Sequence, residues 1–456
     1  MLKKNEEYIV EIIDNGYQGE GIAKIDGITV FIDQAIKGEK IKIKIIKVST
    51  NFCYGKILEI LEEAKERVEP DCKTYKKCGG CSLRHIEYAK TLDIKKDIVQ
   101  NCLYKTLKKE IKVEETIGMK NPLYYRNKLQ YPVGLNEEGN PVMGVYSSRT
   151  HDVVETKECF IQNKTCQEIA NDIFGFIEKN KISVYNEKTL KGTVRHIIVR
   201  IGMKTNEVLV TIVVSDNNFK KEKELVELLT SKYKEIKSIV KNINSENTNV
   251  ILGEKDETIY GDGYIYDVLG NYKFKISAKS FYQTNPIQTE VLYNTAVKQI
   301  KTKGKEKIAI DLYSGIGTIG IFASSYFKKV YGVEIVEEAI EDARENAKIN
   351  DIKNIEFIQG DVENTLPEIL EKEKIEPDVI FVDPPRKGLD NNTITKLLEI
   401  KPKQIIYISC NPATLARDLS KLEEVYEIKK VQPVDMFPYT KHIETVSMII
   451  LHTEEE

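Results

Sequence analysis

The chain has 456 residues, of which 41% are hydrophobic and 30% are charged. This length corresponds to roughly two or three domains, and the composition, without any apolar run near about 18 residues, excludes a disordered or membrane-spanning chain. The formal net charge is only −3, so the chain as a whole lacks the basic field that would indicate a nucleic-acid partner.

Residues 1–62 are expected to form a small β-barrel or open barrel, which we call the N-terminal β unit. Two lysines near the start are followed by no continuous apolar stretch, so we expect no secretory signal, a cytoplasmic protein and reduced cysteines. Short apolar runs then alternate with glycine-containing turns, a period-two pattern that predicts about five strands. Residues 37–56 hold six lysines and one glutamate, a charge run that is usually a solvated face.

Residues 63–269, the central unit, read as mixed α/β and begin with a basic segment. Residues 72–109 carry ten Lys and Arg against three Asp and Glu. Helical spacing over about residues 86–118 predicts a helix that could pack on the C-terminal part of the chain. Beyond it, the patterns predict strands at 129–133, 196–201 and 207–214 and helices near 165–180 and 219–234.

Residues 270–456, the C-terminal unit, have a regular rhythm. Seven apolar strand candidates follow one another, and helical segments separate most of them. This alternation predicts an α/β fold of the Rossmann-like type, with a doubly wound and mainly parallel seven-stranded sheet.

A glycine-rich turn follows the first of these strands. DLYSGIGTIG, residues 311–320, places Gly315, Gly317 and Gly320 between a strand and a helix, where glycines let the backbone approach a ligand. Glu334 ends the next strand candidate, where an acid can hold the ribose of a nucleotide. The spacing alone fits both NAD and S-adenosylmethionine.

The ends of the later strands favour S-adenosylmethionine. Asp361 follows the third strand candidate, Asp383 begins DPPR after the fourth, and Cys410 lies in SCNP after the fifth. Acids and prolines at successive carboxyl ends are typical of a methyltransferase sheet that opens on a planar substrate. A dehydrogenase with proline-rich loops is the alternative.

Cys410 has the most suggestive setting of the eight cysteines, although a lone cysteine at a strand end is more often a small buried hydrophobe. Carbon 5 of a pyrimidine becomes nucleophilic when a thiolate adds to carbon 6, and a base must later remove the carbon 5 proton. Such an enzyme needs a cysteine and a carboxylate or imidazole in one pocket. His442 and Glu444 offer both types, and Glu444 is the better candidate.

Three further cysteines, Cys72, Cys78 and Cys81, lie within ten residues around a Gly-Gly pair. With a fourth thiolate they could hold zinc or an iron–sulfur cluster, and ligand type alone does not separate the two. Lysines and aromatic side chains nearby suit a single-stranded or looped RNA, from which the target uracil must be flipped out. The candidate RNA contacts are Lys73, Tyr75, Lys76, Lys77, Arg84, Arg126, Lys128 and Arg149.

Five ordered motifs together resemble the RNA uracil-5 methyltransferase family. They are SFYQTN (280–285), DLYSGIGTIG (311–320), DPPRKGL (383–389), SCNPATLARDL (409–419) and KHIETV (441–446). The N-terminal β unit resembles the TRAM domain of the members that modify 23S ribosomal RNA, so the resemblance runs nearly end to end.

The resemblance implies a role for each matching residue. Cys410 is expected to be the nucleophile and Glu444 the base. The family's S-adenosylmethionine contacts match Gln283, Tyr313, Glu334 and Asp383, beside the glycines Gly315 and Gly317. An asparagine contact of the family falls on Thr318 here and is not carried over.

The resemblance also implies a [4Fe–4S] cluster on Cys72, Cys78, Cys81 and Cys159, with a structural or RNA-contacting role. Cys53, Cys102 and Cys166 are spare candidates for the fourth ligand. The expected activity is S-adenosylmethionine-dependent formation of 5-methyluridine in 23S ribosomal RNA by a monomer that binds no membrane. The alternatives are the same reaction on transfer RNA and a noncatalytic RNA-binding or ribosome-assembly protein.

Overall fold

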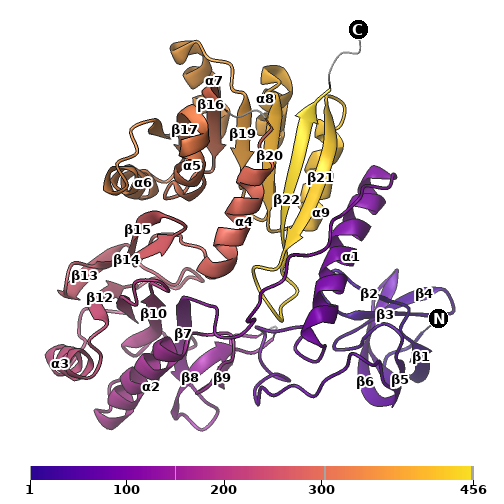
Figure 1. Cartoon of the computed structure of the whole chain (residues 1–456). Helices are drawn as coiled ribbons and strands as arrows, with labels where there is room; N and C mark the ends of the chain where they lie inside the picture. Colours follow the sequence, from indigo (N-terminus) through magenta and orange to yellow (C-terminus); the bar gives the residue numbers. More distant parts are fainter. Residues whose placement is uncertain (1, 149, 302–303, 453–456) are drawn as a thin grey trace.

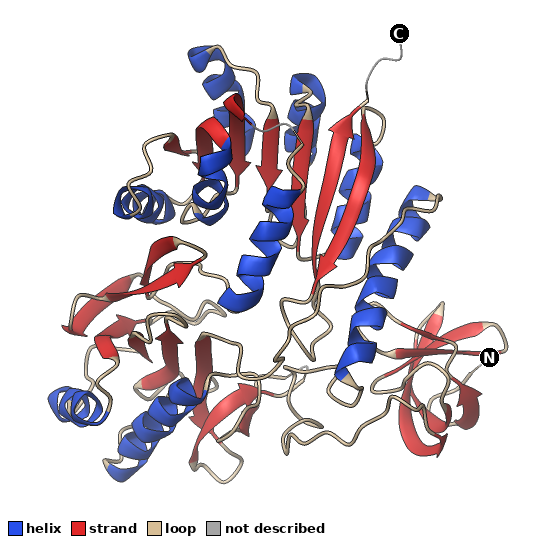
Figure 2. Ribbon diagram, viewed as in Figure 1, coloured by secondary structure: helices blue, strands red, loops and turns tan. Residues whose placement is uncertain are grey.

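The computed structural model describes residues 2–148, 150–301 and 304–452, and its three large sheets lie in separate parts of the molecule (Figures 1 and 2). The C-terminal unit lies above the central unit, and the N-terminal β unit lies to one side (Figure 1). No helix in these ranges is both long and apolar enough to cross a membrane.

The N-terminal β unit is a sheet in the order β1-β5-β6-β4-β3-β2. Its strands are β1 (Glu7–Glu11), β2 (Asp14–Asn15), β3 (Gly21–Ile25), β4 (Ile28–Ile32), β5 (Lys40–Val48) and β6 (Phe52–Glu62). It has six strands where about five were expected, because the turn-rich residues 14–25 contain the short β2 and also β3. The lysines of β5 alternate with buried Ile41, Ile43 and Ile45, so this charge run is a solvated strand face.

Helix α1 (Tyr88–Leu107) joins the N-terminal β unit to the C-terminal unit. Its apolar residues Val99, Leu103 and Leu107 belong to the same core as the sheet of the C-terminal unit. The helix is shorter than the predicted 86–118, since it ends at Lys108 in the left-handed conformation. The chain then becomes extended, and Val113 and Ile117 pair with strand β21 (Tyr426–Val434).

The central unit is a sheet with two helices on one face. Its strands, in the order β13-β12-β11-β10-β7-β8-β9, are β7 (Lys128–Leu135), β8 (Pro141–Tyr146), β9 (Val153–Glu155), β10 (Val194–Ile201), β11 (Val208–Val214), β12 (Ile236–Ile243) and β13 (Lys255–Tyr260). Helices α2 (Lys164–Lys179) and α3 (Glu222–Lys232) cover the apolar face. The opposite face looks toward the C-terminal unit, whose core includes Leu209 and Val240.

A hairpin of β14 (Tyr264–Leu269) and β15 (Tyr272–Ser277) follows. The expected boundary at residue 270 falls in its turn. Both strands contribute to the core of the C-terminal unit through Ile265, Leu269, Phe274 and Ile276. The hairpin therefore packs as part of that unit.

The C-terminal sheet confirms the predicted α/β fold and all seven predicted strands. Its order is β18-β17-β16-β19-β20-β22-β21, and the first five strands are parallel. The strands besides β21 are β16 (Gly304–Leu312), β17 (Phe327–Glu334), β18 (Ile355–Gln359), β19 (Val379–Val382), β20 (Gln404–Ser409) and β22 (Glu444–Leu451). Short helix η1 (Ser324–Tyr326) precedes β17.

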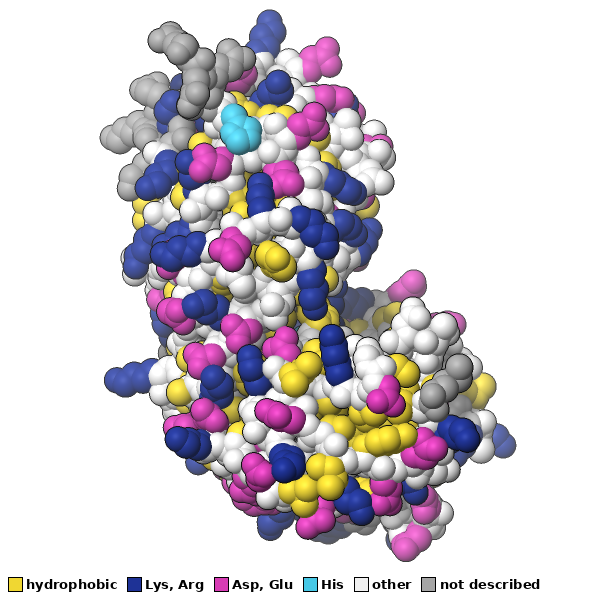
Figure 3. Space-filling model, turned by 90° about the vertical axis from the view of Figure 1, so that its right-hand side faces the viewer, with side chains coloured by type: hydrophobic (Ala, Val, Ile, Leu, Met, Phe, Trp, Pro, Cys, Tyr) yellow, Lys and Arg dark blue, Asp and Glu magenta, His cyan; other side chains and the backbone are white. Residues whose placement is uncertain are grey.

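Helices cover both faces of this sheet, as a doubly wound fold requires (Figure 2). One face packs against α4 (Pro286–Lys298), α5 (Thr318–Ala323) and α6 (Glu337–Ile349). The other packs against α7 (Val362–Glu373), α8 (Asn391–Ile400), α9 (Pro412–Leu422) and the distant α1. On the side of the molecule that carries α1, cations and acids are interspersed (Figure 3).

Candidate active site

Three of the predicted residues meet at the carboxyl end of the parallel strands. Asp383 directly follows β19 and Cys410 directly follows β20, and the two strands are parallel neighbours. Glu444 is the first residue of β22, which runs antiparallel to β20 and pairs Thr445 with Ser409. The sheet register therefore brings a thiol and two carboxyls from three separate segments close together.

The Cys410 thiol is partly buried beside negative charge. Burial, followed by the carboxyls of Glu444 and Asp383, raises its pKa to about 11, while the Arg386 guanidinium acts in the opposite direction. The group is therefore a thiol at neutral pH in the free protein. A cation or a proton acceptor beside it would favour the nucleophilic thiolate.

Glu444 is buried, with 4% of its surface exposed. Burial and the neighbouring Asp383 raise its pKa well above the ordinary value, and Arg386 again opposes the shift. Burial also raises the pKa of Asp383. A carboxyl group with a raised pKa is a stronger base once it is ionised, which suits proton removal from a carbon atom.

Asn411, directly after Cys410, connects three segments around the thiol. Its side chain caps α9 by accepting from Ala413 N and donates to the Arg386 carbonyl at 3.0 Å. Its Oδ1 also accepts a 2.7 Å hydrogen bond from the Tyr17 hydroxyl, which comes from the N-terminal β unit. Gln18 in the same turn accepts from Lys441, which precedes Glu444. Nothing in the local sequence around Tyr17 indicated this contact.

The glycine-rich turn has the geometry that its sequence predicts. Gly315 and Gly317 have φ angles of 53° and 81°, and a Cβ on Gly317 would lie 2.4 Å from the Phe357 ring. The Gly315 amide donates to Glu334 at 3.0 Å, so the predicted ribose-binding acid lies against this turn. Tyr313 is also left-handed, with φ 64°.

The floor of this site is acidic. Asp311 is fully buried beneath the glycine turn, accepts from the Gly320 amide at 2.8 Å, and has a pKa that burial raises to about 8. Asp383 and Glu334 raise this pKa further. A bound cation would favour the ionised forms of these acids and a pyrophosphate would oppose them, so the site suits the sulfonium of S-adenosylmethionine better than NAD.

The SFYQTN segment joins the central unit to this site. The Gln283 and Thr284 carbonyls accept hydrogen bonds from the Asn127 side chain and amide, at 3.1 and 2.9 Å. Asn285 caps α4 and donates to the Met436 carbonyl at 2.9 Å. Gln283 is thus held where the two units meet, with the exposed phenyl ring of Phe281 nearby in the chain.

The four predicted ligand thiols also lie near one another. Cys72, Cys78 and Cys81 occupy an irregular loop, and Cys159 lies in the turn before α2. Burial raises the pKa of Cys78, and that of Cys81 to about 12, and neighbouring thiols of the set add to both shifts. In residues 2–148, 150–301 and 304–452, however, no three His, Cys, Asp or Glu side chains are arranged to hold a metal ion.

The spare cysteines lie elsewhere. Cys53 is buried in the core of the N-terminal β unit, and Cys166 in the core beneath α2. Cys102 packs from α1 on the C-terminal sheet. Cys159, by contrast, is close enough to Cys78 and Cys81 to raise the pKa of both.

Two of the expected RNA contacts are unsuited to that role. Arg84 is buried, forms a 2.6 Å ion pair with Asp71 and stacks on two aromatic rings, those of Phe160 and Tyr439. Tyr75 is buried too, and its hydroxyl lies 2.6 Å from His85 Nδ1. The lysines nearby are exposed, and Arg149 lies outside the described residues. The exposed cations of the loop are Lys73, Lys76 and Lys77.

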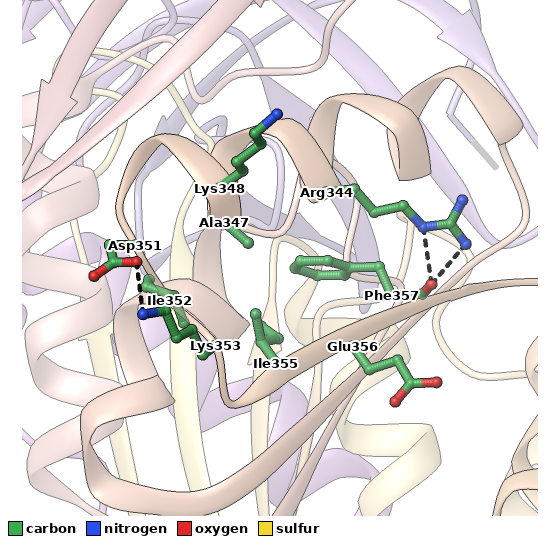
Figure 4. A pocket seen from close by; sticks show the side chains of 9 residues that line it. All are labelled: Arg344, Ala347, Lys348, Asp351, Ile352, Lys353, Ile355, Glu356 and Phe357. Carbon is green, nitrogen blue, oxygen red and sulfur yellow. Dashed lines mark hydrogen bonds and ion pairs between the residues drawn. The ribbon is translucent and has the colours of Figure 1, made fainter.

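A surface hollow of about 570 Å³ lies away from this chemistry (Figure 4). It is formed by the end of α6 and the first residues of β18, at the edge opposite to the strand ends that carry Asp383 and Cys410. Arg344 in its wall is already bonded to the Phe357 carbonyl at 2.8 Å. We assign no part of the reaction to it.

Two family models match this chain. The family model of tRNA (uracil-5-)-methyltransferases matches residues 87–452, and that of the TRAM domain matches residues 2–58. An uncharacterized RNA methyltransferase of Clostridium acetobutylicum is 47% identical over 452 residues, which cover 98% of each chain. One of Staphylococcus epidermidis is 44% identical over 455 residues, covering 100% of this chain and 99% of that one.

A solved structure matches over almost the full length. It is the Pyrococcus abyssi tRNA (uracil-54, C5)-methyltransferase in complex with S-adenosyl-L-homocysteine, with a TM-score of 0.77 and 26% identity. The match covers 97% of this chain and 100% of that one.

Proposed function

This chain belongs to the tRNA (uracil-5-)-methyltransferase family and carries a TRAM domain, and on that premise we propose that it methylates carbon 5 of a uridine in 23S ribosomal RNA. It is an S-adenosylmethionine-dependent RNA methyltransferase. The observation that carries the proposal is the position of Cys410 beside Glu444 and Asp383, where one thiol and one strong base can act on the same ring.

In the proposed reaction, Cys410 gives its proton to solvent water, and its sulfur then bonds to carbon 6 of the uracil. The electron pair of the ring double bond moves toward carbon 5, which becomes an enolate carbon. When bound, S-adenosylmethionine supplies the electrophilic methyl group that this carbon takes. The Glu444 carboxylate then removes the carbon 5 proton, the double bond re-forms, and the carbon–sulfur bond to Cys410 breaks.

Several residues would position the reactants. Arg386 favours the charged forms of Cys410 and Glu444, and Asn411 holds the Arg386 loop against the turn after Cys410. The glycine turn and the acids around it suit a nucleoside that carries a positive charge, as the sulfonium of S-adenosylmethionine does; these acids are Asp311, Glu334 and Asp383. Gln283 and Tyr313 are proposed contacts of the same cofactor.

We also propose that Cys72, Cys78, Cys81 and Cys159 hold a [4Fe–4S] cluster. The donor chemistry fits, because four thiols from two loops influence one another and no spare cysteine competes for the fourth position. A cubane takes one thiolate on each iron, so its ligands spread more widely than those of a single ion. The cluster would crosslink the loop of Cys72, Cys78 and Cys81 to the loop of Cys159, and no step of the methylation requires it.

Transfer RNA remains the second candidate substrate. The protein from Pyrococcus abyssi is a tRNA methyltransferase, and its structure matches 97% of this chain. Because this match includes nearly all of the chain, the TRAM domain does not by itself argue against tRNA. We favour a monomer that acts on RNA in the cytoplasm in either case.

One pair of experiments tests both parts of the proposal. RNA carrying 5-fluorouridine should trap a denaturation-resistant adduct with the wild type but not with Cys410→Ala, since fluorine cannot be removed as a proton. A noncatalytic RNA-binding protein would form no adduct. Mapping 5-methyluridine in cells lacking the protein should show loss from 23S ribosomal RNA, and loss from tRNA instead would establish the second substrate.

A further inference from the structure

Three cations lie on one face of the central sheet where it meets the C-terminal unit. Lys128 is the first residue of β7, and Arg126, two residues before it in a bridge to Gln162, is close enough to lower the pKa of Lys128. Arg200 on β10 pairs directly with Lys128 in the antiparallel register. Their neighbours Leu129 and Val199 face the helices on the other side, so the three cations face the C-terminal unit.

These charges have no carboxylate partner in the described part of the chain, and Arg126 lies near the Cys159 thiol, whose raised pKa it opposes. In the described ranges, none of the three forms an ion pair with a carboxylate, and Arg200 donates only to the Ala278 carbonyl, at 3.3 Å. Arg200 is only 6% exposed, and the buried Nε atoms of Arg126 and Arg200 have no hydrogen-bond partner. Burial and the two arginines lower the pKa of Lys128 to about 7.

Among the described residues, several cations at buried positions pair with carboxylates, whereas Arg195 on the same sheet donates only to the Asn244 and Glu246 carbonyls. Lys95 is fully buried with Asp435, and Arg67 forms an ion pair with the buried Glu39. Lys241 on the same central sheet contacts two glutamates, Glu222 and Glu257. Three adjacent cations without such partners destabilise the free protein unless an external anion joins them.

The group is next to the proposed reaction centre. Asn127, between Arg126 and Lys128, is the residue that binds the Gln283 and Thr284 carbonyls. Arg126 is also close enough to His442 to lower its pKa, and His442 is two residues before Glu444. An anion held here would therefore lie between the SFYQTN segment and the loop that leads to the base.

We propose that Arg126, Lys128 and Arg200 form a binding site for a backbone phosphate of the substrate RNA, next to the uridine that enters the active site. The inference rests on the proposed function, since it assigns a subsite for that same substrate. A phosphodiester presents two charged oxygens to several donors at once, and contacts of this kind position a nucleic acid without reading its sequence. RNA binding would then supply the missing anion.

Lys128→Met tests the site, because this lysine retains some exposure and its replacement removes charge with little change in shape. We expect RNA affinity to fall about tenfold and the slope of log affinity against log salt to decrease by about one. The melting temperature of the free protein should rise, because an unpaired charge has been removed. Lys241→Met is the matched control, and it should lower the melting temperature and leave RNA affinity unchanged.

A second arm identifies the phosphate. RNA hairpins that carry a single neutral methylphosphonate on one side or the other of the 5-fluorouridine are compared with unmodified RNA. For one of these linkages, the wild type should lose about tenfold in affinity and Lys128→Met should lose almost nothing, since both changes remove the same contact. Inorganic phosphate at millimolar concentration is added to the wild type in the same assays. If it stabilises the protein but does not compete with RNA, the site binds free anions and the proposal is overturned.

Two outcomes separate this inference from the proposed reaction. If the wild type forms the fluorouridine adduct but Lys128→Met retains full RNA affinity and salt dependence, the phosphate site is wrong and the reaction stands. If the wild type forms no adduct while Lys128→Met still loses affinity, the protein binds RNA at this site without the proposed chemistry. A lower melting temperature for Lys128→Met would show a structural lysine and overturn the inference.

Discussion

The two thiol sites of this protein differ in what surrounds the sulfur. Cys410 has carboxyls as its neighbours and ends a strand that is hydrogen-bonded on both sides. Cys78 and Cys81 have other thiols as neighbours and lie in an irregular loop. Burial raises the pKa in both places, so burial alone does not distinguish a nucleophile from a ligand. The neighbouring groups do, since a base supports turnover and further thiols support a shared ion or cluster.

The supports of the two sites differ in the same way. Sheet hydrogen bonds fix Ser409, the residue directly before Cys410, and they form whether or not a ligand is bound. The cysteine loop depends on side-chain contacts such as Arg84 with Asp71 and Tyr75 with His85. We therefore expect substitutions at Cys410 to abolish chemistry with little loss of stability, and substitutions in the four-thiol set to do the reverse.

Cys410→Ala should have the largest effect on activity. Without a sulfur to add to carbon 6, the methylation rate is expected to fall by about a thousandfold or more, and the fluorouridine adduct should disappear. The melting temperature should change by only a few degrees, because the side chain is small and partly exposed. Methyl transfer from labelled cofactor measures the first effect, and Cys102→Ala is a control that should keep full activity.

Glu444→Gln should come next, with turnover lowered by about a hundredfold to ten-thousandfold. The amide cannot accept the carbon 5 proton, so the covalent RNA complex should accumulate on ordinary uridine RNA after one methyl transfer. Gel electrophoresis under denaturing conditions would detect it. If Glu444→Gln turned over at the wild-type rate and the denaturing gel showed no protein bound to the RNA, Glu444 would be excluded as the base.

Cys81→Ser tests the other side of the comparison. If the four thiols hold a cluster, the variant should lose iron and visible absorbance, and its melting temperature should fall by roughly 5 °C or more. The rate of the chemical step at saturating RNA should fall far less than in Cys410→Ala. Removal of iron from the wild type by a chelator should reproduce the stability loss, and Cys102→Ser should show neither change.

The contrast between the two sites also shows how far sequence reasoning reaches. Apolar runs in the sequence predicted all seven strands of the C-terminal sheet. Because the carboxyl ends of parallel strands lie at one edge of a sheet, the sequence also predicted that the residues at these ends would meet, namely Cys410, Asp383 and Glu334. Strand β13 was missed because its residues KDETIY are largely exposed and carry no apolar period. The extended course of residues 108–118 depends on pairing with β21, a contact that no local pattern encodes.

Arg386→Met should alter the pH dependence of Cys410 by a smaller amount. The guanidinium lowers the pKa of this thiol, so its loss should raise the pKa and leave less thiolate at any given pH. Adduct formation should slow several-fold near neutral pH, and the rise in rate with pH should shift to higher pH. Measurement of adduct rates from about pH 6 to 10 with both proteins would reveal the shift. A parallel drop at every pH would mean that Arg386 binds RNA instead.

Tyr17→Phe should have the smallest effect, and it tests whether Cys410 is supported by the sheet alone. The lost hydroxyl donates to Asn411, which caps α9 and holds the Arg386 carbonyl, so the turn after Cys410 should become less fixed. The expected result is a drop of about twofold to tenfold in kcat with little change in RNA affinity. Tyr54→Phe in the same β unit is the control, since that hydroxyl makes no contact with the catalytic loops. Equal kcat values for the two variants would show that the β unit only binds RNA. A lower kcat for Tyr17→Phe alone would show that a residue nearly 400 positions away in sequence helps to hold the nucleophile in place.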